Sequence, residues 1–243
     1  MVCNSGASLV PTIDGKMHHF NNVGLYDALF VMQDTESKTL WSHITGEALY
    51  GPLVGRSLGP IRNLLQTRVD QALEEDSKTR IAISDRPYFV AGKPATPGGP
   101  TGPRNNLAPE AQLQDFFIKT LGQEDHRRPR MDMGLGVWTG KTSRYYPISQ
   151  IRERGLAFMD QIDGRKVLIY IDPETNSPAA IFVNSARAEM KDREVHLDNG
   201  AILRKGVLLD RNGRRQIAEL PQQMFTRWYG FALTFPGCEV SGQ

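Results

Sequence analysis

Four Asp-Gly or Asn-Gly pairs, each lying between short apolar or β-branched runs, constrain the fold of this chain more than any other pattern. They are Asp14-Gly15, Asp163-Gly164, Asn199-Gly200 and Asn212-Gly213. Such pairs accept the left-handed backbone that a two-residue hairpin turn requires, because glycine carries no Cβ and Asp and Asn tolerate this conformation. The sequence therefore predicts a series of antiparallel hairpins in both halves of the chain.

Apolar runs between these turns indicate the strands. Leu29–Asp34 is a run suited to a buried strand, and Thr39–Ile44 returns after the polar turn at Thr35–Lys38. In the second half, strands are expected at Val167–Ile171 and Ala180–Val183, which are apolar and rich in β-branched residues.

Helical spacing of apolar residues occurs in a few segments. Ile61–Glu75 predicts an amphipathic helix, and Ala108–Leu121 predicts a second one. A short helix is expected near Ile148–Glu153, and the aromatic stripe within Gln222–Phe235 predicts a C-terminal helix. Gly134-Leu135-Gly136, with no third glycine, is interpreted as a turn.

Composition narrows the class of protein. The chain has 243 residues, of which 40% are hydrophobic and 23% charged, with a net charge of +2, as in ordinary globular proteins. This balance gives no electrostatic footprint for nucleic acid, and no apolar run reaches the roughly 20 residues of a membrane span. No signal peptide is visible, so the compartment stays open. A segment composed mostly of Gly and Pro at 92–103 predicts an exposed link, which divides the chain into 1–60, 61–130 and 131–243.

The two halves resemble each other in the same order along the chain. Asn4–Val10 aligns with Asn176–Phe182, and Phe30–Asp34 aligns with Gly206–Asp210. We therefore predict an α+β fold, mostly antiparallel β, made of two related β-rich units with a few helices. A helix, a hairpin and a strand precede Asn176 but have no counterpart before Cys3, so the N-terminus is expected to be incomplete.

One segment carries a family resemblance. Asp34–Ala48, followed by Gly51-Pro52-Leu53, resembles a prokaryotic domain family of unknown function that includes selenocysteine-containing members, and Tyr145–Pro147 and Trp228–Pro236 support the match. The resemblance implies that Cys3 is the second member of a Cys-x-x-Cys or Cys/Sec motif whose first member lies upstream of Met1. It implies no established activity and no cofactor.

Cys3 is the sharpest candidate for chemistry. A thiolate is nucleophilic, and a nearby cation or a second thiol lowers its pKa, so Cys3 is a candidate for redox catalysis or soft-metal binding. The alternative is that Cys3 is a small buried hydrophobic residue.

The second candidate is the run from Trp41 to Glu47. In a strand, Trp41 and His43 share one face, so His43 is a candidate base and Glu47 a candidate acid or base that orients it. Trp41 and Thr45 are expected to contact substrate in the same cleft. The open alternative places Trp41 in the core and uses Glu47 in a structural hydrogen bond.

Ser5 and Tyr146 complete the predicted site as substrate contacts, and no metal is assigned to it. His18 and His19 face opposite ways in a strand, and none of the usual metal-ligand spacings is present. Phosphate-loop, nucleophile-elbow and zinc-helix motifs are likewise missing from the sequence, and no cofactor is expected.

Two functional hypotheses follow. The first is a thiol- or selenol-dependent redox protein that acts on a small molecule or a protein thiol through Cys3, His43 and Glu47. The second is a non-catalytic ligand-binding or structural module that uses the same cleft. Whether the protein is an enzyme is left open at this stage.

Overall fold

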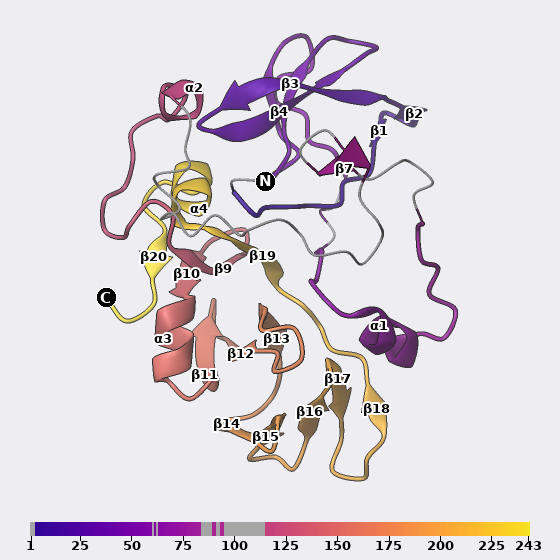
Figure 1. Cartoon of the computed structure of the whole chain (residues 1–243), viewed down its shortest axis with the longest axis vertical. Coiled ribbons are helices and arrows are strands. Elements are labelled where there is room, and N and C mark those ends of the chain that lie inside the picture. The colour runs from indigo at the N-terminus through magenta and orange to yellow at the C-terminus, as the bar shows by residue number, and fades with distance from the viewer. Residues whose placement is uncertain (1–2, 60, 62, 84–88, 91–92, 95–114) are drawn as a thin grey trace.

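The computed structural model describes residues 3–59, 61, 63–83, 89–90, 93–94 and 115–243 (Figure 1). Within these residues the chain forms short meandering sheets and a few short helices. Every strand pair is antiparallel except that of β10 (Ser143–Pro147) with β20 (Glu239–Val240), which is parallel. The predicted class, mostly antiparallel β with a few helices, is confirmed.

The N-terminal part contains a hairpin and a four-stranded meander. The hairpin pairs β1 (Thr12–Ile13) with β2 (Lys16–Met17), and the meander has the order β3–β4–β5–β6. Its strands are β3 (Phe20–Tyr26), β4 (Leu29–Asp34), β5 (Leu40–Ser42) and β6 (Ala48–Tyr50). The buried strand predicted at Leu29–Asp34 is therefore confirmed. The strand predicted at Thr39–Ile44 is shorter, because the chain enters a turn at His43.

The C-terminal part contains three further sheets, with orders β19–β9–β10–β20, β11–β12–β13 and β14–β15–β16–β17–β18. Their remaining strands are β9 (Met133–Trp138), β11 (Ala157–Ile162), β12 (Arg165–Ile171), β13 (Pro178–Phe182), β14 (Ala188–Lys191), β15 (Glu194–Leu197), β16 (Ile202–Arg204), β17 (Val207–Leu209), β18 (Arg215–Gln216) and β19 (Gln222–Arg227). A short pair, β7 (Phe89–Val90) with β8 (Lys93–Pro94), lies between the two parts in sequence. All four Asx-Gly pairs connect antiparallel strands, as predicted.

One prediction about local structure is wrong and another is right only in part, because the C-terminal helix expected within Gln222–Phe235 is confirmed only as α4 (Trp228–Thr234). Gly134–Gly136 lies inside β9 and is not a turn, and Gln222–Arg227 is the strand β19 paired with β9. A Cβ on Gly136 would come within 2.2 Å of the Phe231 ring. Glycine is therefore present for close packing of α4 on β9, and the ladder with β9 overrides the helical spacing of Met224 and its neighbours.

The helices are α1 (Val69–Glu75), α2 (Asp115–Ile118), α3 (Ile148–Glu153) and α4 (Trp228–Thr234). The α3 prediction is confirmed. The helix predicted at Ile61–Glu75 begins only at Val69, and Val69 and Leu73 are 55% and 39% exposed, so the apolar stripe finds little surface to pack against. Half of the predicted helix at Ala108–Leu121 falls outside the described residues, and α2 lies in the other half. Most of the Gly/Pro segment at 92–103 also falls outside them.

Helix α4 packs against both the N-terminal and the C-terminal part of the chain. Trp228 and Phe231 pack in one buried cluster with Tyr145 of β10 and with Ile44, which follows β5. In Figure 1, α4 lies between the β3–β4 sheet and β9–β10. The N-terminal meander is thus placed against the C-terminal sheet, while the proposed boundaries at 60 and 130 stay predictions. No helix in the described segments is long and apolar enough to cross a bilayer.

Candidate functional site

The start of the described chain is fixed against the junction of β19 and α4. The hydroxyl of Thr226 and the backbone N–H of Arg227 donate hydrogen bonds to the Cys3 carbonyl, at 2.8 and 3.1 Å. Asn4 has φ of 55°, a left-handed conformation that Asn tolerates better than most residues, and its side chain donates to the Phe225 carbonyl at 3.2 Å. This turn brings the Ser5 side chain back over Cys3.

Cys3, Ser5 and His43 form a continuous chain of hydrogen bonds. Ser5 Oγ lies 2.7 Å from Cys3 Sγ and 3.0 Å from Nε2 of His43. The other ring nitrogen, Nδ1, lies 2.8 Å from the Phe30 carbonyl. Because a carbonyl only accepts, Nδ1 must carry a proton, which leaves Nε2 of the neutral ring as an acceptor. The Ser5 hydroxyl can therefore relay a proton between the thiol and the imidazole.

The electrostatics of this chain favour the thiolate. Burial raises the pKa of the Cys3 thiol, but the neighbouring His43 imidazole, through its positive charge when protonated, and the hydrogen bonds from Ser5 lower it by more. The result is a pKa of about 7 in place of the ordinary 9. A thiol with this pKa is substantially ionised at neutral pH, and ionisation is what makes cysteine nucleophilic.

The sulfur is nevertheless shielded from bulk solvent. Cys3 is 3% exposed and belongs to a buried cluster with Ala28, Phe117, Met131 and Tyr229. Burial and the adjacent Cys3 raise the pKa of Tyr229, so its hydroxyl stays protonated beside the sulfur. A reactant that reaches Sγ must therefore be small or must enter beside His43.

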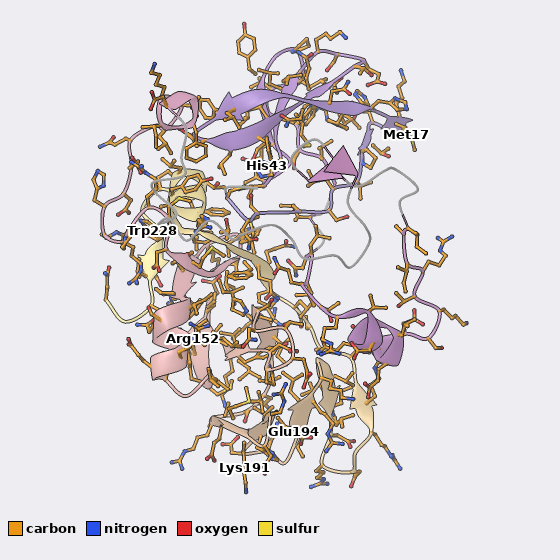
Figure 2. The ribbon with its side chains drawn as sticks, in the orientation of Figure 1. Met17, His43, Arg152, Lys191, Glu194 and Trp228 are labelled. Atoms are coloured by element: carbon orange, nitrogen blue, oxygen red, sulfur yellow. The ribbon has the colours of Figure 1, made fainter. Side chains whose placement is uncertain are left out.

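A small cavity opens on the far side of His43. It has a volume of 120 Å³, and His43, Thr45, Glu47 and Asp27 line it together with residues of α4. Figure 2 shows His43 beneath the β3–β4 pair. Thr45 Oγ1 donates to the Glu47 carboxylate at 3.2 Å. Neither Cys3 nor Ser5 lines this cavity, so His43 is the residue that the cavity and the thiol share.

Burial also raises the pKa of Asp27 in this cavity, although a hydrogen bond from the Gly122 backbone partly offsets the effect. Asp27, Tyr229 and the Phe30 carbonyl were not predicted as site groups from the sequence. Asp27 lies in the two-residue turn between β3 and β4, whose second residue is Ala28 with φ of 56°. Because that position holds no glycine, the turn lacks the usual hairpin signal.

Two predicted site residues lie elsewhere. Trp41 is fully buried against Phe20, and its indole Nε1 donates to Asp34 Oδ2 at 2.8 Å. Tyr146 is fully buried in the cluster around α3 and β11, and its hydroxyl donates to Asp160 at 2.9 Å. Both are scaffold positions in this structure. The turn after Ser42 sends His43 away from Trp41, so the two side chains do not line one face.

The carboxylate that holds Trp41 is part of a separate polar cluster. Ligand atoms of His18, Asp34 and Glu36 lie within 4.8 Å of one another. Asp34 already accepts hydrogen bonds from Ser37, from the Thr39 backbone, from Trp41 and from His18. This cluster closes the β4–β5 turn with its acceptors occupied, and it includes neither Cys3 nor His43.

The fold and the site define a β-rich, mostly antiparallel protein that carries a Cys–Ser–His hydrogen-bond chain with a buried thiol. A family model described as a protein of unknown function (DUF3179) matches residues 1–232, and the chain belongs to that family. No curated protein and no solved structure matches the chain.

Proposed function

We propose that this protein is a thiol-dependent redox protein in which Cys3 is the reactive group and His43 its proton partner. The observation that carries the proposal is the hydrogen-bond chain from Cys3 Sγ through Ser5 Oγ to His43 Nε2. A low-pKa thiol beside an imidazole is the arrangement that reactive cysteines share. A relative with selenocysteine in this motif would use a selenolate in the same surroundings.

The oxidant that suits this site is a small hydroperoxide, because Cys3 is 3% exposed and only a small molecule can reach its sulfur. The Cys3 thiolate attacks the terminal peroxide oxygen, an S–O bond forms and the O–O bond breaks. Sulfur loses two electrons and becomes a sulfenic acid. The departing alkoxide or hydroxide takes the proton that His43 holds, which completes an alcohol or water.

Cys238 cannot resolve this sulfenic acid, because Cys3 and Cys238 are buried in different clusters, so the cycle closes with a thiol outside residues 1–243. That thiol displaces water from the sulfenic acid and forms a mixed disulfide. A second thiol then attacks the mixed disulfide, releasing Cys3 as a thiol and the two external thiols as a disulfide.

The test is oxidation of the purified protein by hydrogen peroxide, with a dimedone-type reagent to trap sulfenic acid and mass spectrometry to locate it. Trapping at Cys3, with none at Cys238, supports the proposal, and His43→Gln is expected to slow it. Cys3→Ser is the control for reagent specificity. Absence of a sulfenic acid at Cys3 in the reduced protein would contradict the proposal.

The alternative is a non-catalytic binding module. The cavity beside His43 favours it, because Asp27, Thr45 and Glu47 line that cavity while Cys3 does not. On this account a fragment that shifts the His43 ring signals in NMR spectra binds wild-type protein and Cys3→Ser equally. Loss of that binding in Cys3→Ser would favour the thiol-dependent function.

For the architecture, we propose that the segments Asn4–Asp34 and Asn176–Asp210 are two copies of one unit. Asn4 and Asn176, which the sequence alignment pairs, both have φ of 55°. Asp34 and Asp210 each begin a turn, and in each the Asp side chain accepts backbone N–H hydrogen bonds. Superposition of the two segments in a crystal structure tests this, and a match only in another strand order would contradict it.

A further inference from the structure

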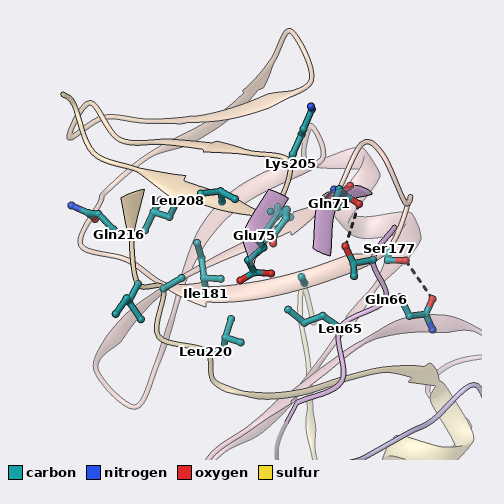
Figure 3. A pocket seen from close by; sticks show the side chains of 18 of the residues that line it. Leu65, Gln66, Gln71, Glu75, Ser177, Ile181, Lys205, Leu208, Gln216 and Leu220 are labelled. Atoms are coloured by element: carbon teal, nitrogen blue, oxygen red, sulfur yellow. Dashed lines mark hydrogen bonds between the residues drawn. The ribbon is translucent and has the colours of Figure 1, made fainter. Parts of the chain in front are cut away.

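A larger cavity lies away from Cys3, between α1 and the C-terminal β unit. Its volume is 350 Å³, within the range of about 300–1,000 Å³ typical of small-molecule sites. Figure 3 shows Leu65, Ile181, Leu208 and Leu220 converging on it from four different segments. One side of the cavity is therefore an apolar surface.

Polar contacts fix α1 as the opposite wall. Gln71, the buried residue of α1, donates through Nε2 to Asp172 Oδ2 at 3.1 Å. At the rim, Lys205 lies 3.2 Å from Glu74, and Arg215 donates to the Glu75 carbonyl. These contacts connect α1 to the Asp172 turn and to β18. They therefore hold α1 in place as the wall of the cavity that faces the apolar surface.

A tyrosine in the wall of this cavity has a hydroxyl with no protein hydrogen-bond partner among the described residues. Tyr170 of β12 is 6% exposed and lines the cavity, yet its hydroxyl makes no hydrogen bond within the described part of the chain. Tyr145, Tyr146 and Tyr229, which are also buried, all donate to an oxygen. The Tyr170 hydroxyl is therefore poised for a hydrogen bond that a ligand would supply.

The charges around the cavity determine which kind of ligand group can accept a hydrogen bond from the Tyr170 hydroxyl. Burial, together with the negative charges of Asp172 and Glu75, raises the pKa of Tyr170, so the hydroxyl is a donor and needs an acceptor oxygen. Asp172 is occupied by Gln71 and by the backbone N–H groups of Glu174 and Thr175. Lys205 and Arg215 also line the cavity, but each is paired with a carboxylate of α1, Glu74 and Glu75, so neither is left free for an anionic ligand. An ammonium group would give the hydroxyl no acceptor.

We propose that this cavity binds a small neutral molecule with an apolar body and a carbonyl oxygen, which accepts the Tyr170 hydroxyl while the body covers Leu65, Ile181, Leu208 and Leu220. This site is separate from the Cys3 chain, so its occupancy does not depend on the thiol chemistry.

The experiment compares three eight-carbon probes of similar length by ligand-observed NMR titration of the full chain: 2-octanone, octanoate and octylammonium. The proposal predicts that 2-octanone binds most tightly. Tyr170→Phe, which removes only the hydroxyl, is expected to weaken 2-octanone binding by about three- to ten-fold. Equal binding of 2-octanone to wild type and Tyr170→Phe would overturn the proposal, as would tighter binding of either charged probe.

A second pair of variants locates the site without touching the core. Leu65 lines the cavity and is 47% exposed, whereas its neighbour Leu64 is 54% exposed and is not part of the lining. Leu65→Trp fills the opening and is expected to abolish 2-octanone binding, and Leu64→Trp is the matched control that keeps it. Binding that survives Leu65→Trp would place the probe elsewhere and overturn the assignment.

Discussion

Nε2 of His43 lies 3.0 Å from Oγ of Ser5, although 38 residues separate the two in sequence. The contact exists because the N-terminal segment is fixed to the β19–α4 junction while His43 begins the turn after β5. Ser5 then reaches Cys3 on its other side. The surroundings of the thiol consequently depend on how the N-terminal meander and α4 pack together.

Removal of the Ser5 hydroxyl should raise the pKa of Cys3. Ser5→Ala deletes a donor 2.7 Å from the sulfur while leaving the charge of His43 in place. We expect the midpoint of Cys3 alkylation against pH to move upward from about 7, by less than in His43→Gln. Ser8→Ala is the control, because Ser8 is close in sequence but takes no part in the Cys3–Ser5–His43 hydrogen-bond chain. An unchanged midpoint in Ser5→Ala would refute the proton relay through Ser5.

Trp41 should matter for stability and not for the thiol. Trp41→Phe removes the indole N–H that binds Asp34, and loss of a hydrogen bond to a buried carboxylate costs about 1–3 kcal/mol of unfolding free energy. Denaturant titration measures this loss. Trp138→Phe is the control, because it removes the same ring atoms at a position where the indole makes no hydrogen bond to a described residue. Its loss of unfolding free energy should therefore be smaller. A shifted pKa of Cys3 in Trp41→Phe would show that Trp41 influences the thiol and belongs to the candidate site.

Asp34 should make stability dependent on acid pH. Hydrogen bonds from Ser37, Trp41 and His18 outweigh burial and hold the pKa of Asp34 well below its ordinary value. The unfolded chain therefore binds the proton more readily. The stabilisation is complete above the unfolded pKa of about 4 and is lost as the pH falls from there toward the folded pKa.

Asp34→Asn should be less stable than wild type at neutral pH and should lose less further stability between about pH 5 and pH 2. The exposed Asp14→Asn is the control, expected to follow the wild-type curve. Parallel pH profiles for Asp34→Asn and wild type, measured by denaturant unfolding, would be inconsistent with a depressed pKa of Asp34.

Gly136 should be intolerant of any side chain. A Cβ there would lie 2.2 Å from Phe231, so Gly136→Ala forces α4 away from β9 at a cost of about 1–3 kcal/mol or more. A Cβ on Gly140 would meet no atom within 4 Å, which makes Gly140→Ala the matched control. Equal melting temperatures for the two variants would show that the helix adjusts freely.

Patterns local in sequence predicted the parts of the fold that local chemistry decides. The Asp-Gly and Asn-Gly turns and the Leu29–Asp34 strand needed only turn chemistry and an apolar run. Gln222–Arg227 could not be assigned from spacing, because its apolar residues fit a helix and pairing with β9 made it a strand. Tertiary pairing of this kind is not encoded in one segment.

The candidate site likewise has parts that the sequence could predict and parts that depend on tertiary structure. Cys3, Ser5 and His43 could be predicted as residues with suitable chemistry, and the structure brings them together. The Phe30 carbonyl that orients His43 is a backbone atom, which no side-chain pattern marks. Trp41 was grouped with His43 because both were expected in one strand, and the turn after Ser42 separates them.

The most direct test of the central claim is the pH dependence of alkylation at each cysteine by a small haloacetamide, followed by mass spectrometry. The hydrogen-bond chain predicts a Cys3 midpoint of about 7, whereas burial raises the pKa of Cys238 to about 11, which makes Cys238 an internal reference. In His43→Gln the Cys3 midpoint should rise to the ordinary value of 9 or above, because burial is then less opposed. A wild-type Cys3 midpoint at 9 or higher, or one that His43→Gln leaves unchanged, would contradict the account.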